Sequence, residues 1–122
     1  MKKIEFTIEK KPGFLQLTLT GEYDKKEFLA YPQMLATVCT NEGANKVLVN
    51  ALKLSGTNVS TMDRFYLGES IATLLDRRIK LAVVWPKEHI NKLAETVAFN
   101  RGGWMNVFDD TETAQNWLLG NT

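Results

Sequence analysis

The side chains of this 122-residue chain that could do chemistry are few and far apart. The chain has one histidine, His89, and one cysteine, Cys39. Nucleophilic acyl transfer needs a serine or cysteine, a base and an acid that orients the base. His89 is the single histidine base on offer, Ser60 is a candidate hydroxyl, and no Gly-x-Ser-x-Gly sequence surrounds a serine. Because His89 follows the charged residues Lys87 and Glu88, we expect it to be solvated, and we expect the protein not to be an enzyme.

The sequence does not indicate a metal site or a cofactor site either. Zinc sites combine several His and Cys ligands, and this chain has one of each. Asp109 and Asp110 could ligate a cation, but acidic residues before a helical pattern usually cap the helix. A hydrolase or transferase that uses Ser60, His89 or this acidic pair stays as an alternative hypothesis. This hypothesis predicts turnover of a substrate that the substitution His89→Ala abolishes.

The loop ahead of residue 64 lacks the sequences of the common phosphate-binding loops. Gly56 is not followed by Gly-Lys-Ser/Thr, and Gly-x-Gly-x-x-Gly does not occur in the chain. The loop does lead into a helical pattern that begins after Ser60. The free backbone amides at a helix start favour an anion, such as a phosphoryl group or a carboxylate of a partner.

The residues around this loop predict a strand–loop–helix–strand unit between Lys46 and Pro86. Residues 47–49 and 79–85 are apolar runs, and residues 53–59 are expected to form a loop between the first run and the helix. Ser60 and Asp63 have the spacing of a capping box. The helix that they open would bury the stripe of Leu67, Ile71, Leu74 and Leu75. Such units build parallel sheets, so the loop at the sheet edge is the predicted working surface.

The remaining patterns extend this unit to an α/β fold in one domain, residues 1–122. Residues 4–8 and 15–19 alternate around Pro12-Gly13, which predicts an antiparallel hairpin. The element order is ββαβαβαβα, a mixed, mostly parallel sheet of about five strands with about four helices. We expect a helix from Asp24 to Gly43 that Pro32 kinks or restarts. A further helix is expected to begin at Pro86 and to bury Ile90, Leu93, Ala94, Val97 and Ala98. The last two elements are a strand over 104–108 and a helix that Asp109 or Asp110 caps.

Composition excludes several classes of protein. The net charge is +1 and no basic stripe alternates with aromatic residues, so we expect no nucleic-acid partner. The basic residues Arg77, Arg78 and Lys80 are expected to be a solvated helix end rather than an anion site. Residues 1–11 lack the apolar core of a signal peptide, and no apolar run reaches the length of a membrane span. With Cys39 expected to be a small buried hydrophobe, these features predict a cytoplasmic protein without a membrane span.

Aromatic residues crowd the second half of the chain. Phe108 and Trp117 are expected to lie in the core. Phe65 and Tyr66 are adjacent, so they must point to different sides of their helix. A helix that is apolar on more than one side packs against another helix, a second subunit or a lipophilic ligand.

Four stretches of the chain resemble the STAS domain, named for sulfate transporters and anti-sigma-factor antagonists. The resemblance is to the SpoIIAA-like branch of small stand-alone bacterial proteins, whose fold is also compared with CRAL-TRIO lipid-transfer domains. The most specific feature is Asn100-Arg101-Gly102 followed by a strand that ends in Val107-Phe108. The stretches are VLVNALKLSG at 47–56, DRFYLGESIA at 63–72, KLAVVWP at 80–86 and ETVAFNRGGWMNVFDDTETAQNWL at 95–118.

The resemblance implies a regulatory or binding module rather than an enzyme. In anti-sigma antagonists, a serine in an Asp-Ser-Ser-Gly type motif is phosphorylated at the start of the helix after the central strand, and this controls partner binding. Residues 55–63 of this chain do not contain that motif. Ser60 and Thr61 are the nearest hydroxyls and therefore the candidate phosphoacceptors.

Two binding hypotheses follow. In the first, a non-catalytic regulatory module binds a protein partner, or a second copy of itself, through the loop and the helix start. The residues of this site are Ser55, Gly56, Thr57, Asn58, Ser60, Thr61, Asp63 and Arg64. In the second, the protein carries or senses a small lipophilic or anionic molecule between the helices and the sheet, near Phe65, Tyr66 and Trp85.

Overall fold

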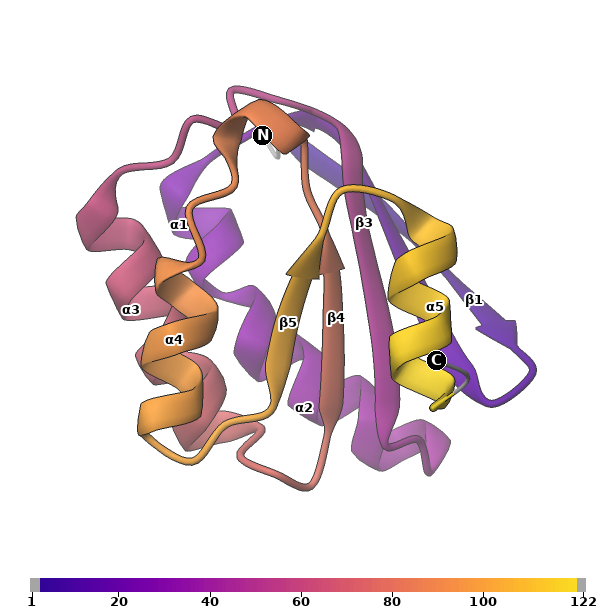
Figure 1. The fold of residues 1–122 in the computed structure, drawn as a ribbon. Coiled ribbons are helices and arrows are strands. Elements are labelled where there is room, and N and C mark those ends of the chain that lie inside the picture. The colour runs from indigo at the N-terminus through magenta and orange to yellow at the C-terminus, as the bar shows by residue number, and fades with distance from the viewer. Residues whose placement is uncertain (1–2, 121–122) are drawn as a thin grey trace.

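A computed structural model describes residues 3–120 as an α/β fold built on a five-stranded sheet (Figure 1). The strands lie in the order in which they follow one another along the chain. The first two pair antiparallel and all later neighbours pair in parallel, which confirms the predicted mixed sheet with an N-terminal hairpin. The strands are β1 (Ile4–Lys11), β2 (Phe14–Glu22), β3 (Lys46–Ser55), β4 (Lys80–Val84) and β5 (Met105–Phe108).

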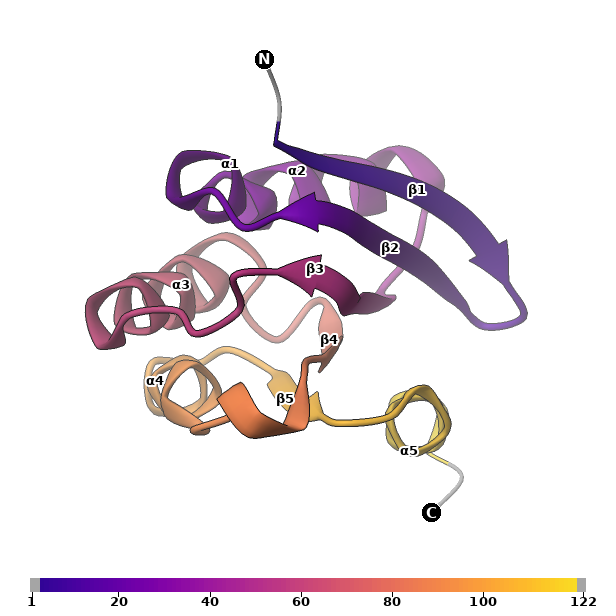
Figure 2. The same ribbon diagram turned by 90° about the horizontal axis from the view of Figure 1, so that it is seen from above.

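Helices cover both faces of the sheet. Four of them, α1 to α4, lie on one face, and α5 lies on the other (Figure 2). None of the helices within residues 3–120 is long and apolar enough to cross a membrane. The helices are α1 (Lys25–Leu29), α2 (Tyr31–Glu42), α3 (Thr61–Leu74), α4 (Leu93–Asn100) and α5 (Thr111–Leu119), with a short 3₁₀ helix η1 (Lys87–His89) between β4 and α4.

The alternation of apolar and polar residues along the hairpin strands determines which side of the sheet carries the main core. Leu15, Leu17 and Leu19 are at most 5% exposed and pack beneath the helices α1 to α4. On the other face, α5 packs on β3, β4 and β5, where Ala114 and Leu118 are fully buried. Phe108 and Trp117 are only half-buried beside this second core, with ring centroids 5.6 Å apart.

The predicted first helix is two helices. Pro32 lies in the first turn of α2, so it marks the start of the longer helix, as one of the two expected alternatives had it. Asp24 caps α1 by accepting a hydrogen bond from the Glu27 amide at 3.1 Å. The Glu27 carboxylate does not return to Asp24. It accepts bonds from the amides of Lys3 and Ile4 at 2.9 and 3.2 Å and so joins α1 to the start of β1.

Strand β3 is longer than the apolar run that predicted it. It continues from residue 49 to Ser55, and its end pairs with β2 from Thr20 to Glu22. The prediction of a loop from Lys53 was therefore wrong at its start. The reason is that Leu54 is buried while Lys53 and Ser55 are exposed, so the strand alternates here instead of being apolar throughout.

The predicted start of the third major helix at Pro86 was also wrong. Pro86 precedes the short helix η1, the chain is extended at Ile90, and α4 begins at Leu93 after Lys92 in a left-handed conformation with φ of 65°. The physical reason is a distant side chain. Arg64 Nη2 donates a hydrogen bond to the His89 carbonyl oxygen at 2.6 Å, and this contact holds the segment away from a helical path.

Helices α3 and α4 cross in close contact at Gly68. A Cβ atom at this position would lie 2.5 Å from the Ala94 carbonyl oxygen and 2.8 Å from Val97 Cβ. These distances are shorter than van der Waals contact, so only glycine permits this approach of the two helices. The crossing positions α4 over the sheet next to α3, beside the candidate site.

Candidate functional site

The candidate site lies where β3 ends and the loop 56–60 leads into α3 (Figure 1). Gly56 turns the chain with φ of 72°, a left-handed conformation that favours glycine. Ser60 caps α3, since its hydroxyl accepts a hydrogen bond from the Asp63 amide at 3.2 Å. The capping box is only half formed, because the Asp63 carboxylate points to Tyr23 rather than back to Ser60.

Tyr23 fixes the buried carboxylate at the helix start. Its hydroxyl donates a hydrogen bond to Asp63 Oδ2 at 2.9 Å, and Lys25 Nζ lies 3.5 Å from the other oxygen. Asp63 is 7% exposed. Burial, and then the bond to Asp63, raise the pKa of Tyr23 far above its usual value, so the phenol remains a donor at neutral pH.

Thr57 is bound from three directions. Its carbonyl oxygen accepts hydrogen bonds from Trp85 Nε1 at 3.1 Å and from the Val59 amide at 2.9 Å. Its hydroxyl lies 2.8 Å from His89 Nδ1, and the tautomer of His89 decides which of the two donates. His89 is therefore half-buried and bonded, and the expectation that it is solvated was wrong. Its backbone is held inward by Arg64, a contact that its charged sequence neighbours could not reveal.

Arg64 joins the loop to the segment after β4. Its Nε donates to the Val59 carbonyl oxygen at 3.0 Å, and its Nη2 donates to His89. Burial lowers the pKa of this half-buried guanidinium, but an arginine keeps its charge at neutral pH. One side chain thus fixes two surface segments that are 30 residues apart.

The predicted binding residues separate into a buried set and an exposed set. Thr57, Asp63 and Arg64 point inward and hold the loop in place. The exposed set forms the surface that a partner can touch, and we call it the rim. The rim consists of Ser55, Gly56, Asn58, Ser60 and Thr61.

Two of the groups that could have formed a catalytic or metal centre, His89 and Asp110, have other partners. His89 Nδ1 is paired with Thr57, and Asp110 caps α5 by accepting bonds from the Thr113 amide and hydroxyl at 2.7 and 2.9 Å. Cys39 is buried as expected, and burial raises the pKa of its thiol. Within residues 3–120, no group of three or more His, Cys, Asp or Glu side chains has the arrangement of a metal site.

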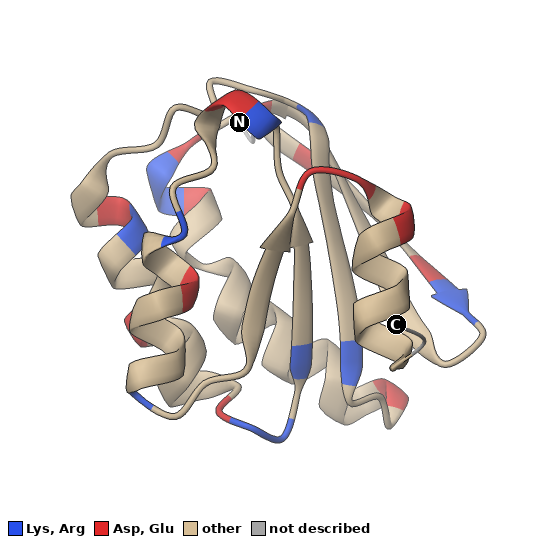
Figure 3. Cartoon of the chain, viewed as in Figure 1, with Lys and Arg blue, Asp and Glu red and all other residues tan. Residues whose placement is uncertain are grey.

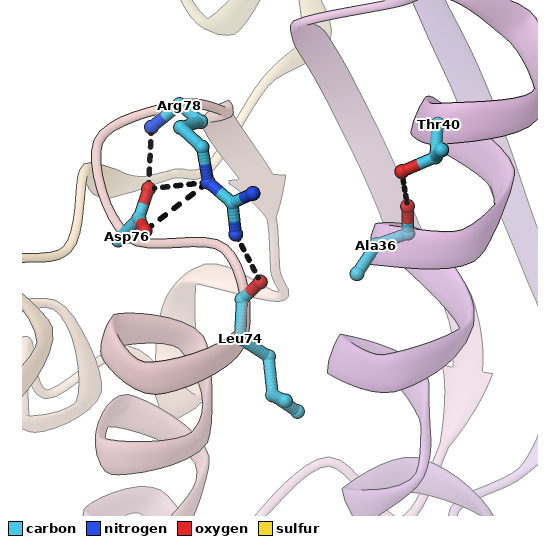
Figure 4. A network of polar contacts seen from close by, with 5 residues as sticks. All are labelled: Ala36, Thr40, Leu74, Asp76 and Arg78. Carbon is cyan, nitrogen blue, oxygen red and sulfur yellow. Dashed lines mark hydrogen bonds and ion pairs between the residues drawn. The ribbon is translucent and has the colours of Figure 1, made fainter.

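The basic residues near the end of α3 do not converge on one site. Arg78 binds Asp76 through its amide at 2.8 Å and its Nε at 3.1 Å, and its Nη2 donates to the Leu74 carbonyl oxygen (Figure 4). Lys80 was expected to be solvated, but its ammonium donates to the Trp117 carbonyl oxygen at 2.6 Å and lies 5.1 Å from the centre of the Trp104 ring. These separate contacts give no common pocket for an anion.

A largely apolar cavity of about 60 Å³ lies between the sheet and the helices α2, α3 and α4. Trp85 lines the cavity, as the second hypothesis expected, together with Asp63 and Arg64 from the loop region. The other lining residues include Phe28, Leu35, Leu67, Ile71, Val83 and Lys92.

Phe65 and Tyr66 do not line this cavity. Arg64, Leu67 and Ile71 face it at helical spacing, so the two aromatic residues point to other sides of α3. Tyr66 is 44% exposed, and the Phe65 ring lies 5.6 Å beneath the Arg101 guanidinium. Of the three residues named for a small ligand, Trp85 alone lines the cavity.

The residues that sequence analysis missed are Tyr23, Val59 and Lys92. Tyr23 and Lys92 lie in connecting segments, where no periodicity marks a side chain that contacts the site. The available signal was weak: an aromatic residue two positions after Gly21, at the end of a strand next to β3 in the sheet.

Comparisons with solved structures give the same fold. An anti-sigma factor antagonist from Mycobacterium paratuberculosis superposes with a TM-score of 0.65 and 12% identity over 95% of this chain and 94% of that chain. The protein TM1081 gives a TM-score of 0.62 and 12% identity, over 94% and 89%. An uncharacterized protein of the DUF3478 family from Shewanella loihica, with a SpoIIAA-like fold, gives 0.54 and 18%, over 94% and 93%. No family model matches the chain, and no curated protein is significantly similar to it.

Proposed function

We propose that this chain, which has the fold of anti-sigma factor antagonists and SpoIIAA-like proteins, is a non-catalytic cytoplasmic regulatory module that binds a protein partner through the rim. The observation that carries the proposal is that five exposed residues stand at the end of β3, on the loop and at the start of α3, and that side chains of three separate segments bind the chain beneath them. Tyr23, Arg64 and Trp85 provide these contacts. A surface that is rigid before binding loses less conformational entropy when a partner docks.

The hydroxyls of the rim fit a regulatory role. Ser60 and Thr61 are exposed at the start of α3, where the free amides of the first turn favour negative charge. A phosphoryl group there would add a charge of about −2 next to the Asp63 carboxylate and would change the electrostatics of the rim. Phosphorylation of either residue would therefore alter partner binding.

The test compares two charged substitutions on opposite faces of the sheet. Thr61→Arg alters the rim, and Asn116→Arg alters an exposed position of α5 as a matched control. A partner isolated with the wild-type protein is purified, and its affinity for each variant is measured by calorimetry. We expect Thr61→Arg to weaken binding at least about tenfold, the effect of roughly 1.4 kcal/mol, and Asn116→Arg to leave it unchanged. Equal affinities for both variants would reject the rim as the site.

The cavity supports a second candidate function, the binding of a small apolar molecule. An enclosed apolar cavity of about 150 Å³ can bind benzene, and this smaller cavity of about 60 Å³ adds the charged residues Asp63, Arg64 and Lys92 to an apolar lining. Benzene, hexanoate and hexanol are suitable probes, and the charged hexanoate tests whether Arg64 and Lys92 contribute. Methyl resonances of Ile71 and Met105, which line the cavity, should shift on titration.

Ala94→Leu provides the control for this second function, because it fills the cavity from α4, while Thr96→Leu changes an exposed position of the same helix. Ala94→Leu should abolish the shifts and Thr96→Leu should preserve them. Spectra that do not respond to any of the three probes would reject this function.

A further inference from the structure

Strand β1 is an open edge of the sheet (Figure 2). The two-residue turn at Pro12-Gly13 makes Lys11 and Phe14 a hydrogen-bonded pair, so the odd-numbered residues of β1 bond to β2. The bond from the Glu22 amide to the Lys3 carbonyl oxygen at 3.1 Å follows the same parity. The amides and carbonyls of the even-numbered residues therefore face outward.

The outward backbone groups at the two edges of the sheet differ in their hydrogen-bond partners. At the β5 edge, the Val107 amide donates to Glu95 Oε2 at 2.8 Å and the Val107 carbonyl accepts from Lys92 Nζ at 2.8 Å. Lys92 and Glu95 also pair with each other at 3.0 Å, so an ion pair covers the outward backbone groups of Val107. At the β1 edge, Glu27 covers only the start, through the amides of Lys3 and Ile4. Within the described residues, the outward groups from Phe6 to Lys10 have no such cover.

Apolar side chains accompany this open stretch. Phe6 is 37% exposed and Ile8 is 42% exposed, although both lie on the helix side of the strand. The Phe6 ring contacts Tyr31 at 6.1 Å, and Ile8 shares a shallow hollow with Met34 and Val38 of α2. Natural edge strands usually avoid exposed apolar residues of this kind.

We propose that β1 pairs antiparallel with β1 of a second copy, about a two-fold axis that passes between the two Ile8 residues. The outward groups of Phe6, Ile8 and Lys10 then exchange about six backbone hydrogen bonds. Two five-stranded sheets become one continuous sheet. The exposed Ile8 side chains and the Met34 and Val38 sides of both α2 helices meet across the axis.

The charges along β1 select this register (Figure 3). With the axis at Ile8, Glu5 faces Lys11 of the second copy, and this favourable pair occurs twice by symmetry. With the axis at Thr7, Glu5 would face Glu9. An axis at Glu9 or at Lys10 would set two like charges against each other. An axis at Phe6 would require the outward amide of Ile4, which Glu27 already binds.

The first test is a charge reversal measured by sedimentation equilibrium over micromolar to millimolar concentrations. The wild-type protein should approach twice the monomer mass as its concentration rises. Glu5→Lys and Lys11→Glu should each weaken the dimer about tenfold, because two favourable pairs become repulsive. The double variant should restore the wild-type affinity. Glu112→Lys, at an exposed position of α5, is the control and should have no effect.

The second test fixes the register by disulfide cross-linking in a Cys39→Ala background. Ile8→Cys should form a cross-linked dimer, because facing Cα atoms of such a pair lie about 5.5 Å apart. Thr7→Cys should not. A wild-type protein that stays monomeric throughout the concentration range would overturn the proposal. Cross-linking of Thr7→Cys in preference to Ile8→Cys, or an affinity increased by Glu5→Lys, would overturn this register.

Discussion

The Arg64 guanidinium lies 2.6 Å from the carbonyl oxygen of His89, and the same side chain binds the carbonyl oxygen of Val59 at 3.0 Å. It therefore connects the loop that carries the rim with the segment that follows β4. Residues 56–60 of the loop have no regular secondary structure, and neither does Ile90 in the segment after β4. The order of this part of the surface depends on side-chain hydrogen bonds more than on backbone ladders.

Loss of this connection should loosen the site more than it destabilises the fold. Arg64→Leu removes two hydrogen bonds from a charged donor, and we expect the free energy of unfolding to fall by about 2 kcal/mol. Amide hydrogen exchange at Val59 and Ile90 should accelerate, while exchange in β3 and β4 should change little. Arg78→Leu, which removes an exposed arginine, is the control. Unchanged exchange at Val59 would contradict the role assigned to Arg64.

The phenol of Tyr23 should stabilise the start of α3. Tyr23→Phe leaves the 7% exposed Asp63 carboxylate without its hydroxyl donor, and we expect a loss of about 1–2 kcal/mol in urea denaturation. Tyr66→Phe removes a hydroxyl from an exposed tyrosine and should leave stability within error. Similar losses in both variants would show that the bond to Asp63 is not the source of the effect.

The close contact at Gly68 predicts a strong response to one methyl group. Gly68→Ala places a Cβ against the Ala94 carbonyl and Val97, so α3 and α4 must separate. We expect a loss of about 1–3 kcal/mol, although alanine is the better helix former. Glu69→Ala on the same helix should change stability much less, because Glu69 is partly exposed. A Gly68→Ala variant more stable than wild type would show that the helices can move apart without cost.

Glu95 gives stability a defined pH dependence. Burial raises the pKa of its carboxyl group above 4.5, against the lowering effects of the Val107 amide and Lys92. A raised pKa means that the folded state binds this proton more tightly than the unfolded state does. The stability from this group is therefore complete below the unfolded pKa and is lost as pH rises through the folded pKa.

Glu95→Gln removes this titration and keeps an acceptor for the Val107 amide. The difference in unfolding free energy between wild type and Glu95→Gln, measured in urea at several pH values, should shift in favour of wild type as the pH falls from 7 to below 4.5. Glu69→Gln, a partly exposed carboxylate of α3, is the control. A difference that is constant with pH, or that changes in the opposite direction, would refute the assignment.

Patterns that depend on neighbouring residues predicted most of the fold. Alternation in β1 and β2 and the apolar runs of β3 and β4 predicted the sheet, because side chains on a strand alternate between its faces. The caps at Asp24, Ser60 and Asp110 were also recognisable, because each binds an amide three residues further along the chain.

Contacts between distant residues could not be predicted in this way. Tyr23 binds Asp63 across 40 residues, and Trp85 binds Thr57 across 28. The helix start at Pro86 was predicted wrongly because Arg64, far earlier in the chain, takes the His89 carbonyl. That Phe65 and Tyr66 point away from the cavity could have been predicted, since the stripe of Leu67 and Ile71 already marked the inward face of α3.

The ion pair of Lys92 and Glu95 over β5 limits how many copies of the chain can add to the sheet. A sheet with two exposed edges can add copies without end and become a filament or an amyloid-like ribbon. Here the backbone groups of Val107 are already occupied. If copies join through β1, each joining consumes the open edge of both, and the assembly terminates at two chains.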